Sequence, residues 1–260
     1  MSQRKMLFFD IDETLVSHKT FTIPESTKRA IKEAQDRGHL VFVNTGRTKS
    51  LIGDDIKELG FDGYECGCGT HIEVNDELVY SKTVNKDIYS DIISNLEKYN
   101  LNAVLEGEEA IYVRKDAPED TLLTNLRRQN YPVKLYDMDN MIFNKMFIRY
   151  DDNKDIDKFC EEIKDSFDYI DHGRGTREII PKGHSKGSGI DFLLKQYNID
   201  LRDTYAFGDS NNDIPMLEYV ANSVAMGNGN PELFDKVTFV TKSIDEDGIE
   251  YALKHFKIID

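Results

Sequence analysis

Three short apolar runs in this chain each end abruptly at a polar residue or a glycine, and helix patterns separate them. We interpret residues 6–9, 40–44 and 205–207 as buried strands. A helix pattern over residues 24–37, which ends at Gly38, joins the first two strands. Buried strands that alternate with helices form parallel sheets with right-handed crossovers, so the sequence predicts an α/β, Rossmann-like core.

Both ends of the chain contribute to this predicted core. A further helix pattern covers residues 48–59 and ends at Gly60. The alternation of strand and helix patterns resumes after Pro181, in the last third of the chain. The elements predicted there are helices at residues 188–197, 214–219 and 246–255 and strands at residues 223–226 and 237–240.

The middle of the chain mixes helix patterns with hairpin-like strands. The helix patterns cover residues 88–99, 119–129 and 156–167. The predicted strands are residues 103–105, 110–114 and 144–150 and a hairpin of residues 168–171 and 176–180. This mixture is typical of an α+β domain with an antiparallel sheet. We therefore expect an α+β cap at residues 84–183, inserted into a core made from residues 1–83 and 184–260.

The charge balance narrows the range of partners. The 260 residues include 33 Lys and Arg against 48 Asp and Glu, which gives a formal net charge of −15. Such a surface disfavours binding to nucleic-acid phosphates and to anionic membranes. The chain has three cysteines, no apolar run of transmembrane length, and an N-terminal apolar segment that ends at Asp10. We therefore expect a cytoplasmic protein without a disulfide framework. The oligomeric state stays open.

Polar clusters follow the predicted core strands. Asp10 and Asp12 come directly after the first strand, residues 45–47 follow the second, and an acidic stretch at residues 208–213 follows the third. Because the carboxyl ends of parallel strands meet at one edge of a sheet, we expect these groups to lie close together, with Lys186 near them. Clustered carboxylates raise one another's pKa unless a cation compensates them, and Mg²⁺ prefers carboxylate, water and phosphate oxygens. The combination favours phosphoryl transfer.

Four motifs in order along the chain resemble those of the haloacid dehalogenase (HAD) superfamily phosphatases, most closely the Cof-like branch with a type IIB cap. The first, residues 10–15, is similar to the family's D-x-D-G-T-hydrophobic motif. The others are residues 44–47, 181–187 and 208–217. Four motifs at the right spacing are a far more specific signal than D-x-D alone. The resemblance implies a Mg²⁺-dependent phosphatase that acts on small phosphorylated metabolites.

The resemblance also implies roles in catalysis and metal binding. Asp10 would be the nucleophile that forms an aspartyl-phosphate, and Asp12 the general acid and then the general base. The Asp10 carboxylate, the Asp12 backbone carbonyl and Asp209 would bind the metal. Asp213 would orient metal-bound water or support Lys186. The predicted metal site therefore consists of Asp10, Asp12, Asp209 and Asp213.

A second group of motif residues would bind the substrate. Thr45 and Gly46 would hold the phosphate, and Lys186 would bridge the phosphate and the nucleophile. Arg47 belongs to the same group, and Asn212 would face the phosphate or the rest of the substrate. In this branch cap residues set selectivity, and the sequence does not specify the substrate. Because the family is broad, the candidates include hexose and other sugar phosphates, flavin mononucleotide and pyridoxal phosphate.

Two stretches depart from the family pattern. Glu13 stands where the first motif has glycine, and the sequence offers no explanation for it. Residues 65–67 differ from the usual Asn-Gly-Ala, so substrate contacts from this loop are not carried over. Cys66, Cys68 and His71 also form a C-x-C-x-x-H cluster. A zinc site would need a fourth ligand, and none stands out nearby, so we interpret the cysteines as loop and core residues.

Two other functions share part of this chemistry. A phosphomutase or other phosphotransferase would use the same first step and pass the phosphoryl group to a sugar hydroxyl. A phosphoacceptor signalling module, similar to a response-regulator receiver, also groups Asp, Thr or Ser, Lys and Mg²⁺ on a parallel sheet. The spacing of the fourth motif favours the phosphatase over the first alternative. The length, the cap and the acid/base Asp12 count against the second.

Overall fold

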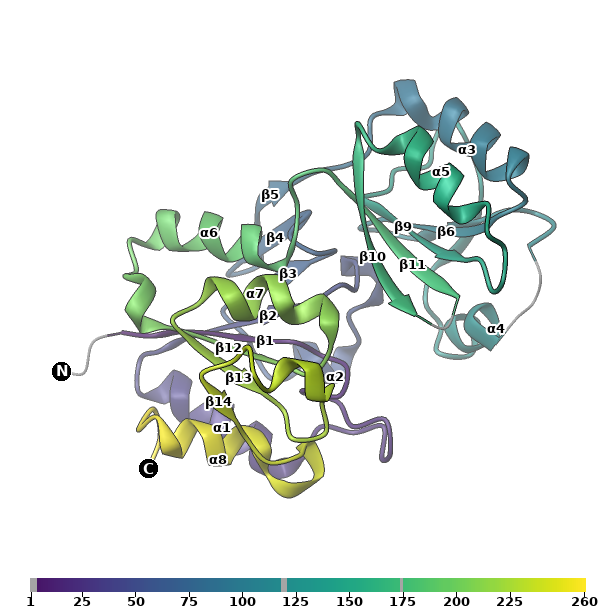
Figure 1. Ribbon diagram of the computed structural model, residues 1–260. Coiled ribbons are helices and arrows are strands. Elements are labelled where there is room, and N and C mark those ends of the chain that lie inside the picture. The colour runs from purple at the N-terminus through teal and green to yellow at the C-terminus, as the bar shows by residue number, and fades with distance from the viewer. Residues whose placement is uncertain (1–3, 118–120, 174) are drawn as a thin grey trace. The chain divides into compact units, whose positions relative to one another are not determined.

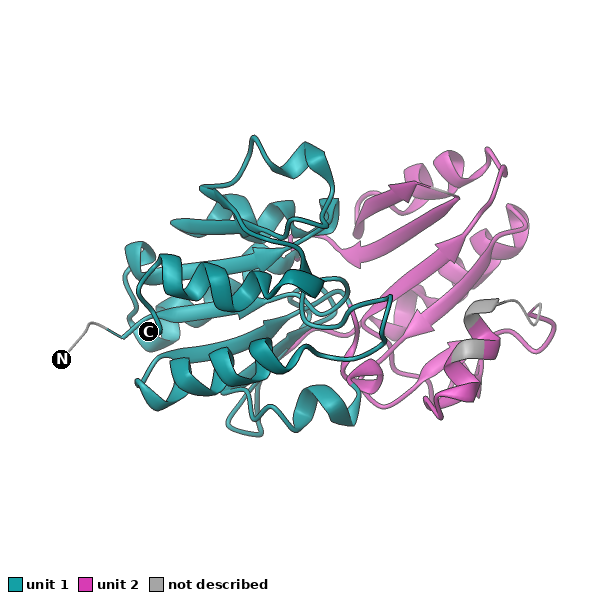
Figure 2. Cartoon of the chain, turned by 90° about the horizontal axis from the view of Figure 1, so that it is seen from below, with its two compact units in different colours: residues 1–46, 53–79, 185–260 teal, residues 47–52, 80–184 magenta. Residues whose placement is uncertain are grey.

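The computed structural model describes residues 4–117, 121–173 and 175–260. The chain divides into two compact units, which Figure 2 shows in different colours. Unit 1 consists of residues 1–46, 53–79 and 185–260, and unit 2 of residues 47–52 and 80–184. The chain therefore leaves unit 1 twice, once for a short segment and once for a long insert.

Unit 1 is built on a mostly parallel sheet, which has eight strands in the described part of the chain. From one edge to the other they are β14 (Phe239–Val240), β13 (Asn222–Ala225), β12 (Thr204–Gly208), β1 (Met6–Phe9), β2 (Leu40–Asn44), β3 (Gly63–Cys66), β4 (His71–Val74) and β5 (Glu77–Ser81). The pairs from β14 to β3 are parallel, and β3 pairs with β4 in the antiparallel sense. The predicted α/β fold with a parallel-sheet core is confirmed.

The register of this sheet brings the polar motifs to one edge. Phe9 of β1 lies opposite Phe207 of β12 and opposite Val43 of β2. The residues that follow these strands, including Asp10 and Thr45, therefore leave the sheet at the same level. Strand β1 is completely buried, as its apolar sequence predicts.

Helices lie on both faces of the unit 1 sheet. Figure 1 shows α6 (Lys186–Tyr197) and α7 (Ile214–Tyr219) on one side and α1 (Glu25–Asp36) and α8 (Gly248–His255) on the other. The predicted apolar face of α1 is buried, and Gly38 ends the turn after the helix with a φ of 83°. Short 3₁₀ turns of unit 1 occur at Leu201–Asp203, Asn211–Asp213, Pro231–Leu233 and Ile244–Glu246, and unit 2 has such turns at Lys49–Leu51 and Lys86–Ile88.

Unit 2 contains a second sheet, of six strands in the described residues. In order they are β10 (Phe167–Gly173), β11 (Thr176–Pro181), β9 (Lys145–Arg149), β6 (Asn102–Glu106), β7 (Ile111–Val113) and β8 (Val133–Leu135). All pairs are antiparallel except β7 with β8. The sheet has the antiparallel character predicted for the middle of the chain.

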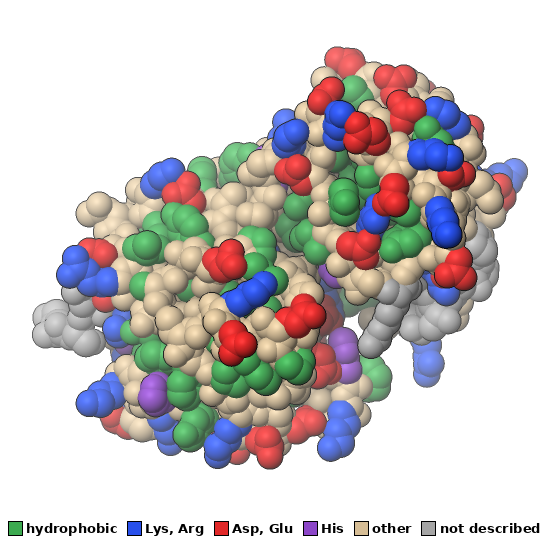
Figure 3. Space-filling model, viewed as in Figure 1, with side chains coloured by type: hydrophobic (Ala, Val, Ile, Leu, Met, Phe, Trp, Pro, Cys, Tyr) green, Lys and Arg blue, Asp and Glu red, His purple; other side chains and the backbone are tan. Residues whose placement is uncertain are grey.

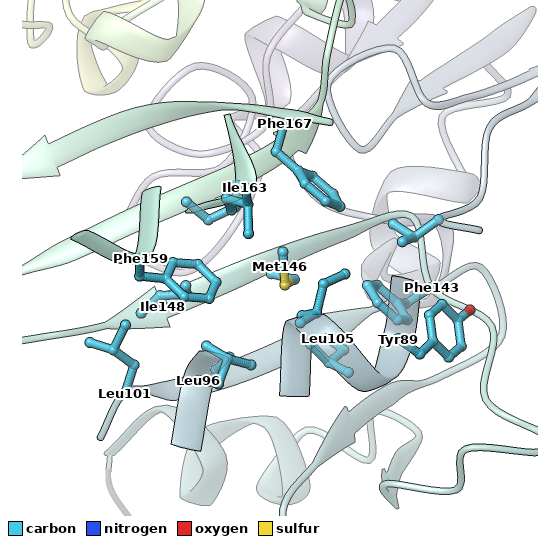
Figure 4. Packing of buried hydrophobic residues seen from close by; sticks show 14 of the residues in the cluster. Tyr89, Leu96, Leu101, Leu105, Phe143, Met146, Ile148, Phe159, Ile163 and Phe167 are labelled. Carbon is cyan, nitrogen blue, oxygen red and sulfur yellow. The ribbon is translucent and has the colours of Figure 1, made fainter. Parts of the chain in front are cut away.

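Two helices cover one face of the unit 2 sheet and enclose an apolar core. They are α3 (Tyr89–Lys98) and α5 (Ile156–Ile163). Figure 4 shows Leu96 and Phe159 from these helices packed around Met146 of β9. A smaller apolar cluster includes Leu123 of α4 (Thr121–Arg128) together with Val104 of β6.

The prediction of one helix over residues 48–59 is wrong. A 3₁₀ turn at Lys49–Leu51 and the short α2 (Asp54–Lys57) are separated by extended backbone at Gly53. The two parts belong to different units, and in unit 2 the Ser50 hydroxyl donates a hydrogen bond to the Gly107 carbonyl (2.8 Å). The helical pattern is broken because its two halves pack in different cores.

Four strands, β3, β4, β5 and β8, have no counterpart among the predicted elements. The hairpin of β3 and β4 buries the polar side chains of Glu65 and His71, so its sequence lacks the apolar pattern that signals a strand. The other predicted elements are confirmed with shifted ends. Glu119, the predicted start of a helix, and Arg174, in the turn of the predicted hairpin, lie outside the described residues.

The surface carries both signs of charge. On the face in Figure 3, acidic and basic side chains are interspersed with apolar and uncharged polar groups. Within the described residues, we find no helix with the length and hydropathy needed to cross a bilayer.

Candidate active site

A buried network of three charged side chains lies at the carboxyl edge of the unit 1 sheet. Asp10 follows β1, Asp213 lies in the turn after β12, and Lys186 is the first residue of α6. The Lys186 ammonium lies 2.6 Å from an Asp10 oxygen and 2.5 Å from an Asp213 oxygen. Burial favours the neutral amine, but the two carboxylates outweigh it and raise the pKa of Lys186 well above its usual range. The raised pKa favours the charged form of Lys186, which places a positive charge beside Asp10.

Lys186 reaches this position because of the way α6 begins. The Ser185 hydroxyl accepts a hydrogen bond from the Ser188 backbone N–H (3.1 Å), and the Ser188 hydroxyl accepts one from the Ser185 N–H (2.9 Å). This capping box starts the helix at Lys186, two residues before the predicted start. The Asn44 amide at the end of β2 also donates to the Lys186 carbonyl (2.9 Å). The lysine backbone is thereby fixed from both the helix and the sheet.

Asp209 adds a third carboxylate to the site. Asp10, Asp209 and Asp213 each present an oxygen, and these oxygens lie within 4.8 Å of one another. Burial and the neighbouring carboxylates raise the pKa of Asp10 and of Asp209, and Lys186 offsets only part of this effect. Three acids at this separation fit a hard divalent cation such as Mg²⁺, which would supply the missing positive charge.

Asp213 is held from two sides. One of its oxygens accepts hydrogen bonds from the backbone N–H groups of Asp209 and Ser210, both at 2.9 Å, and the other contacts Lys186. Gly208 allows this close approach, because a Cβ at that position would lie 2.5 Å from the Asp213 carboxyl carbon. Of the two roles predicted for Asp213, the geometry favours support of Lys186.

The Asp12 carboxylate does not belong to the three-acid cluster, and its side chain is 42% exposed. One of its oxygens lies 3.2 Å from Nε2 of His18. The arrangement suits a residue that gives a metal its backbone carbonyl and keeps its carboxyl for proton transfer. Sequence reasoning did not identify His18, because its only signal is its place in the loop that follows the first motif.

The predicted phosphate- and substrate-binding residues divide between the two units. Thr45 and Gly46 follow β2 in unit 1, where Thr45 is buried, and the half-buried Asn212 lies in the turn after β12 of the same unit. Arg47 is the first residue of unit 2, and its guanidinium donates to the Leu51 carbonyl (3.4 Å). Thr45, Gly46 and Asn212 thus lie at the edge of the sheet that carries Asp10.

Glu65, at the position where the family pattern has asparagine, is an unexpected buried acid. Within the described residues, neither of its carboxyl oxygens has a hydrogen-bond partner. The side chain packs against Gly189 of α6, where a Cβ would come within 2.1 Å of the Glu65 carboxyl carbon. Burial raises the pKa of Glu65 well above its usual range. We therefore expect Glu65 to be protonated and uncharged in the folded protein near neutral pH.

Replacing Glu65 with glutamine should stabilise the protein more at pH 8 than at pH 5. The folded state binds a proton at Glu65 that the unfolded chain releases above the ordinary pKa of 4.5. The stability that depends on this proton is present below pH 4.5 and is lost as the pH rises towards the raised folded pKa, by up to about 1.4 kcal/mol per pH unit. Urea unfolding of both proteins at the two pH values measures the difference.

Glu77→Gln, at an exposed position, is the control for the Glu65 prediction. If the difference in the free energy of unfolding between Glu65→Gln and the wild type is the same at both pH values, Glu65 is ionised in the folded protein.

Among the described residues, the neighbouring His, Cys, Asp or Glu side chains placed to hold a metal ion are Asp10, Asp209 and Asp213, and the cysteine cluster is not part of this group. Cys66 and Cys68 are buried and form no disulfide. His71 is also buried, and its Nε2 lies 2.9 Å from a Glu73 oxygen. These observations support the interpretation of the cysteines as loop and core residues.

Comparisons with known proteins identify the family. A sequence model of the haloacid dehalogenase-like hydrolases matches residues 7–253. YkrA of Bacillus subtilis (strain 168), whose name assigns it provisionally to the phosphatases, is 31% identical over 259 residues, which cover 98% of each chain. YwtE of the same organism, named as a 5-amino-6-(5-phospho-D-ribitylamino)uracil phosphatase, is 29% identical over 284 residues and 96% of each chain.

Solved structures lead to the same family. One described as the HAD subclass IIB sugar phosphatase BT4131 matches with a TM-score of 0.84 and 29% identity, over 98% of this chain and 100% of that one. The matched residues 7–253 include all four motifs identified in the sequence. The predicted family and the predicted class of enzyme, a phosphatase, are both confirmed: this chain belongs to the haloacid dehalogenase-like hydrolases.

Proposed function

We propose that this protein is a Mg²⁺-dependent phosphatase that hydrolyses small phosphate monoesters, similar to sugar phosphates, through an aspartyl-phosphate at Asp10. The observation that carries the proposal is the buried contact of Lys186 with Asp10 and Asp213, next to Asp209. An anionic carboxylate can attack an anionic phosphate only where nearby positive charge reduces their repulsion. Lys186 supplies such charge, and a bound Mg²⁺ would supply the rest.

In the first step an Asp10 oxygen forms a bond to phosphorus as the bond to the ester oxygen breaks. Asp12, in its protonated form, gives its proton to that leaving oxygen. In the second step Asp12 takes a proton from water, and the resulting hydroxide displaces Asp10 from phosphorus. Asp10, Asp209 and the Asp12 carbonyl would hold the metal, and Lys186 would bridge Asp10 and the phosphate.

The remaining predicted residues fit substrate binding. Thr45 and the Gly46 N–H would donate hydrogen bonds to a phosphate oxygen, and Arg47 and Asn212 would contact the phosphate or the rest of the substrate. We assign residues 1–83 and 184–260 to a catalytic core and residues 84–183 to a cap that selects the substrate. The sugar phosphatase among the similar structures supports sugar phosphates as the first class to test. Because three cysteines are too few for a disulfide framework, we place the protein in the cytoplasm.

A panel of phosphate esters tests this function. Sugar phosphates, flavin mononucleotide and pyridoxal phosphate are assayed with Mg²⁺ and ranked by kcat/KM, because a single good turnover does not establish specificity. We expect release of orthophosphate, loss of activity in EDTA and recovery when Mg²⁺ is added back. Activity that survives complete removal of the metal would contradict the role of the three-acid cluster.

The products also separate the two alternatives from hydrolysis. An isomerised sugar phosphate without orthophosphate would identify a phosphomutase. A stable phosphoprotein with negligible turnover would identify a phosphoacceptor signalling module.

A further inference from the structure

The loop after Asp12 contains a glutamate where the family motif has glycine. Glu13 has a φ of 57°, a left-handed conformation that glycine adopts most easily. Its side chain is tied at two points. One carboxylate oxygen accepts a hydrogen bond from the His18 backbone N–H (2.6 Å), and the other accepts one from the Asn228 amide (3.1 Å). Glu13 therefore has defined contacts that a glycine could not make.

Asn228 connects Glu13 to the rest of unit 1. Its amide nitrogen also donates to the Glu13 carbonyl (2.8 Å), and its amide oxygen accepts from the Ile244 backbone N–H (2.8 Å). The strained position of Glu13 is thus fixed through both its backbone and its side chain.

The His18 ring lies between the carboxylates of Glu13 and Asp12. Its Nδ1 is 3.3 Å from a Glu13 oxygen, and its Nε2 is 3.2 Å from an Asp12 oxygen. The ring is 57% exposed, so packing alone does not fix its position. Glu13 contacts both the backbone and the ring of His18, and through Nε2 of His18 it contributes to the position of the Asp12 carboxyl.

We propose that Glu13 and His18 are positioning residues that orient the Asp12 carboxyl for proton transfer to the leaving group. This inference rests on the proposed function, in which the proton of Asp12 goes to the ester oxygen as the Asp10–phosphorus bond forms. A well-placed general acid contributes about 10²–10⁴-fold to the rate, and a displacement of about 1 Å can remove about 10²-fold. An Asp12 side chain free to rotate in solvent would lose part of this contribution.

The dependence of the rate on the leaving group tests the inference. An alkyl ester needs a proton on its departing oxygen, whereas p-nitrophenolate leaves without one. Wild-type and variant kcat/KM are therefore compared for p-nitrophenyl phosphate and for the alkyl phosphate that ranks highest in the ester panel. The value of kcat/KM reports on the steps up to formation of the aspartyl-phosphate and excludes the later hydrolysis, in which Asp12 also acts.

Two isosteric changes at His18 separate its contacts. His18→Gln places an amide nitrogen near the position of Nε2 and retains the contact with Asp12, whereas His18→Asn places one near Nδ1 and loses it. We expect His18→Asn to lower kcat/KM for the alkyl ester by about tenfold or more and for p-nitrophenyl phosphate by less than about threefold. His18→Gln should recover most of the loss. Glu13→Gly, which restores the family residue, should show the same selective loss as His18→Asn.

The outcomes separate this inference from the proposed function. Equal losses for both esters, or equal effects of the two His18 variants, would show that the loop has only a structural role and would overturn the inference. Wild-type protein that hydrolyses neither ester would overturn the proposed function and this inference together.

Discussion

Replacement of Asp10 by asparagine is expected to lower kcat for every ester by at least about 10⁴-fold, because the amide cannot form the acyl-phosphate. Asparagine has nearly the same shape as aspartate, so the buried contact with the Lys186 ammonium (2.6 Å in the wild type) is weakened without leaving a cavity. The loss should therefore appear in turnover and not in folding. Steady-state assays with Mg²⁺, together with circular dichroism of the same samples, check both parts of the prediction.

Asp36→Asn is the matched control for this change. Asp36 lies on α1, is exposed, and forms a pair with Lys32 one helical turn earlier. An exposed pair of this kind contributes about 0–1 kcal/mol to stability, and kcat should not change. If Asp10→Asn keeps the turnover of the wild type, Asp10 is not the nucleophile. If the variant is inactive and its free energy of unfolding is also strongly reduced, Asp10 has a structural role. Asp10→Glu, which keeps the negative charge, then separates this structural role from the chemical one.

Much of unit 1 could be predicted because its signals are local. The apolar run before Asp10 is short and ends at a polar residue, which favours a buried strand. Parallel strands bring their carboxyl ends to one edge. The contact of Asp10 with Lys186 joins residues 176 positions apart, and what made it predictable was the order of four motifs. Element ends were less predictable: the capping box at Ser185, which begins the helix before Lys186, has no Glu or Gln at its third helical position.

The features that sequence reasoning missed depend on contacts between distant segments. The position of Glu13 became explicable only when Asn228 was found beside it, 215 residues further along the chain. Residues 48–59 carry a helical pattern, yet the chain uses their two halves in different units. Glu65 lies in a strand where a charge would be costly, and nothing local indicates that α6 covers it. In each case tertiary packing overrides the local pattern.

Lys145→Met is expected to destabilise unit 2 by about 3–5 kcal/mol, because it removes the cation from a buried ionic cluster. The Lys145 ammonium lies 2.7 Å from a Glu106 oxygen and 2.5 Å from a Glu178 oxygen. The three side chains come from β9, β6 and β11 and are 3%, 10% and 4% exposed. Burial of both carboxylates is therefore tolerated only with the lysine in place.

The electrostatics of the two glutamates show how they share this cation. Burial raises the pKa of Glu106, and Lys145 only partly compensates. At Glu178 the effect of burial is outweighed by Lys145 and by His172, whose Nε2 lies 3.3 Å from the carboxylate, so that its pKa falls to about 2. Without Lys145, two carboxylates would remain close together in a site of low polarity, and the native state would have to bind a proton or open.

Hydrogen exchange measures the predicted loss of stability in unit 2 itself, since a single melting temperature is poorly defined for a protein with two units. Exchange of the β6 and β9 amides should become faster in Lys145→Met, while the β1 and β12 amides should keep their protection. Lys98→Met is the matched control, because Lys98 pairs with Glu162 in the same unit at 2.9 Å but with both side chains about half exposed. It should cost less than about 1 kcal/mol.

The triple change Lys145→Met, Glu106→Gln and Glu178→Gln should recover most of the stability lost in the single variant. A buried ion pair contributes little compared with neutral groups of similar volume, and the main cost lies in leaving one partner charged and alone. If Lys145→Met costs no more than Lys98→Met, the cluster is accessible to water in solution and its charges are solvated. If the triple variant is as unstable as the single one, the loss comes from packing of the lysine side chain. If the triple variant recovers the stability that Lys145→Met loses, the balance of charge in the cluster, and not the shape of the lysine side chain, stabilises this part of the unit 2 sheet.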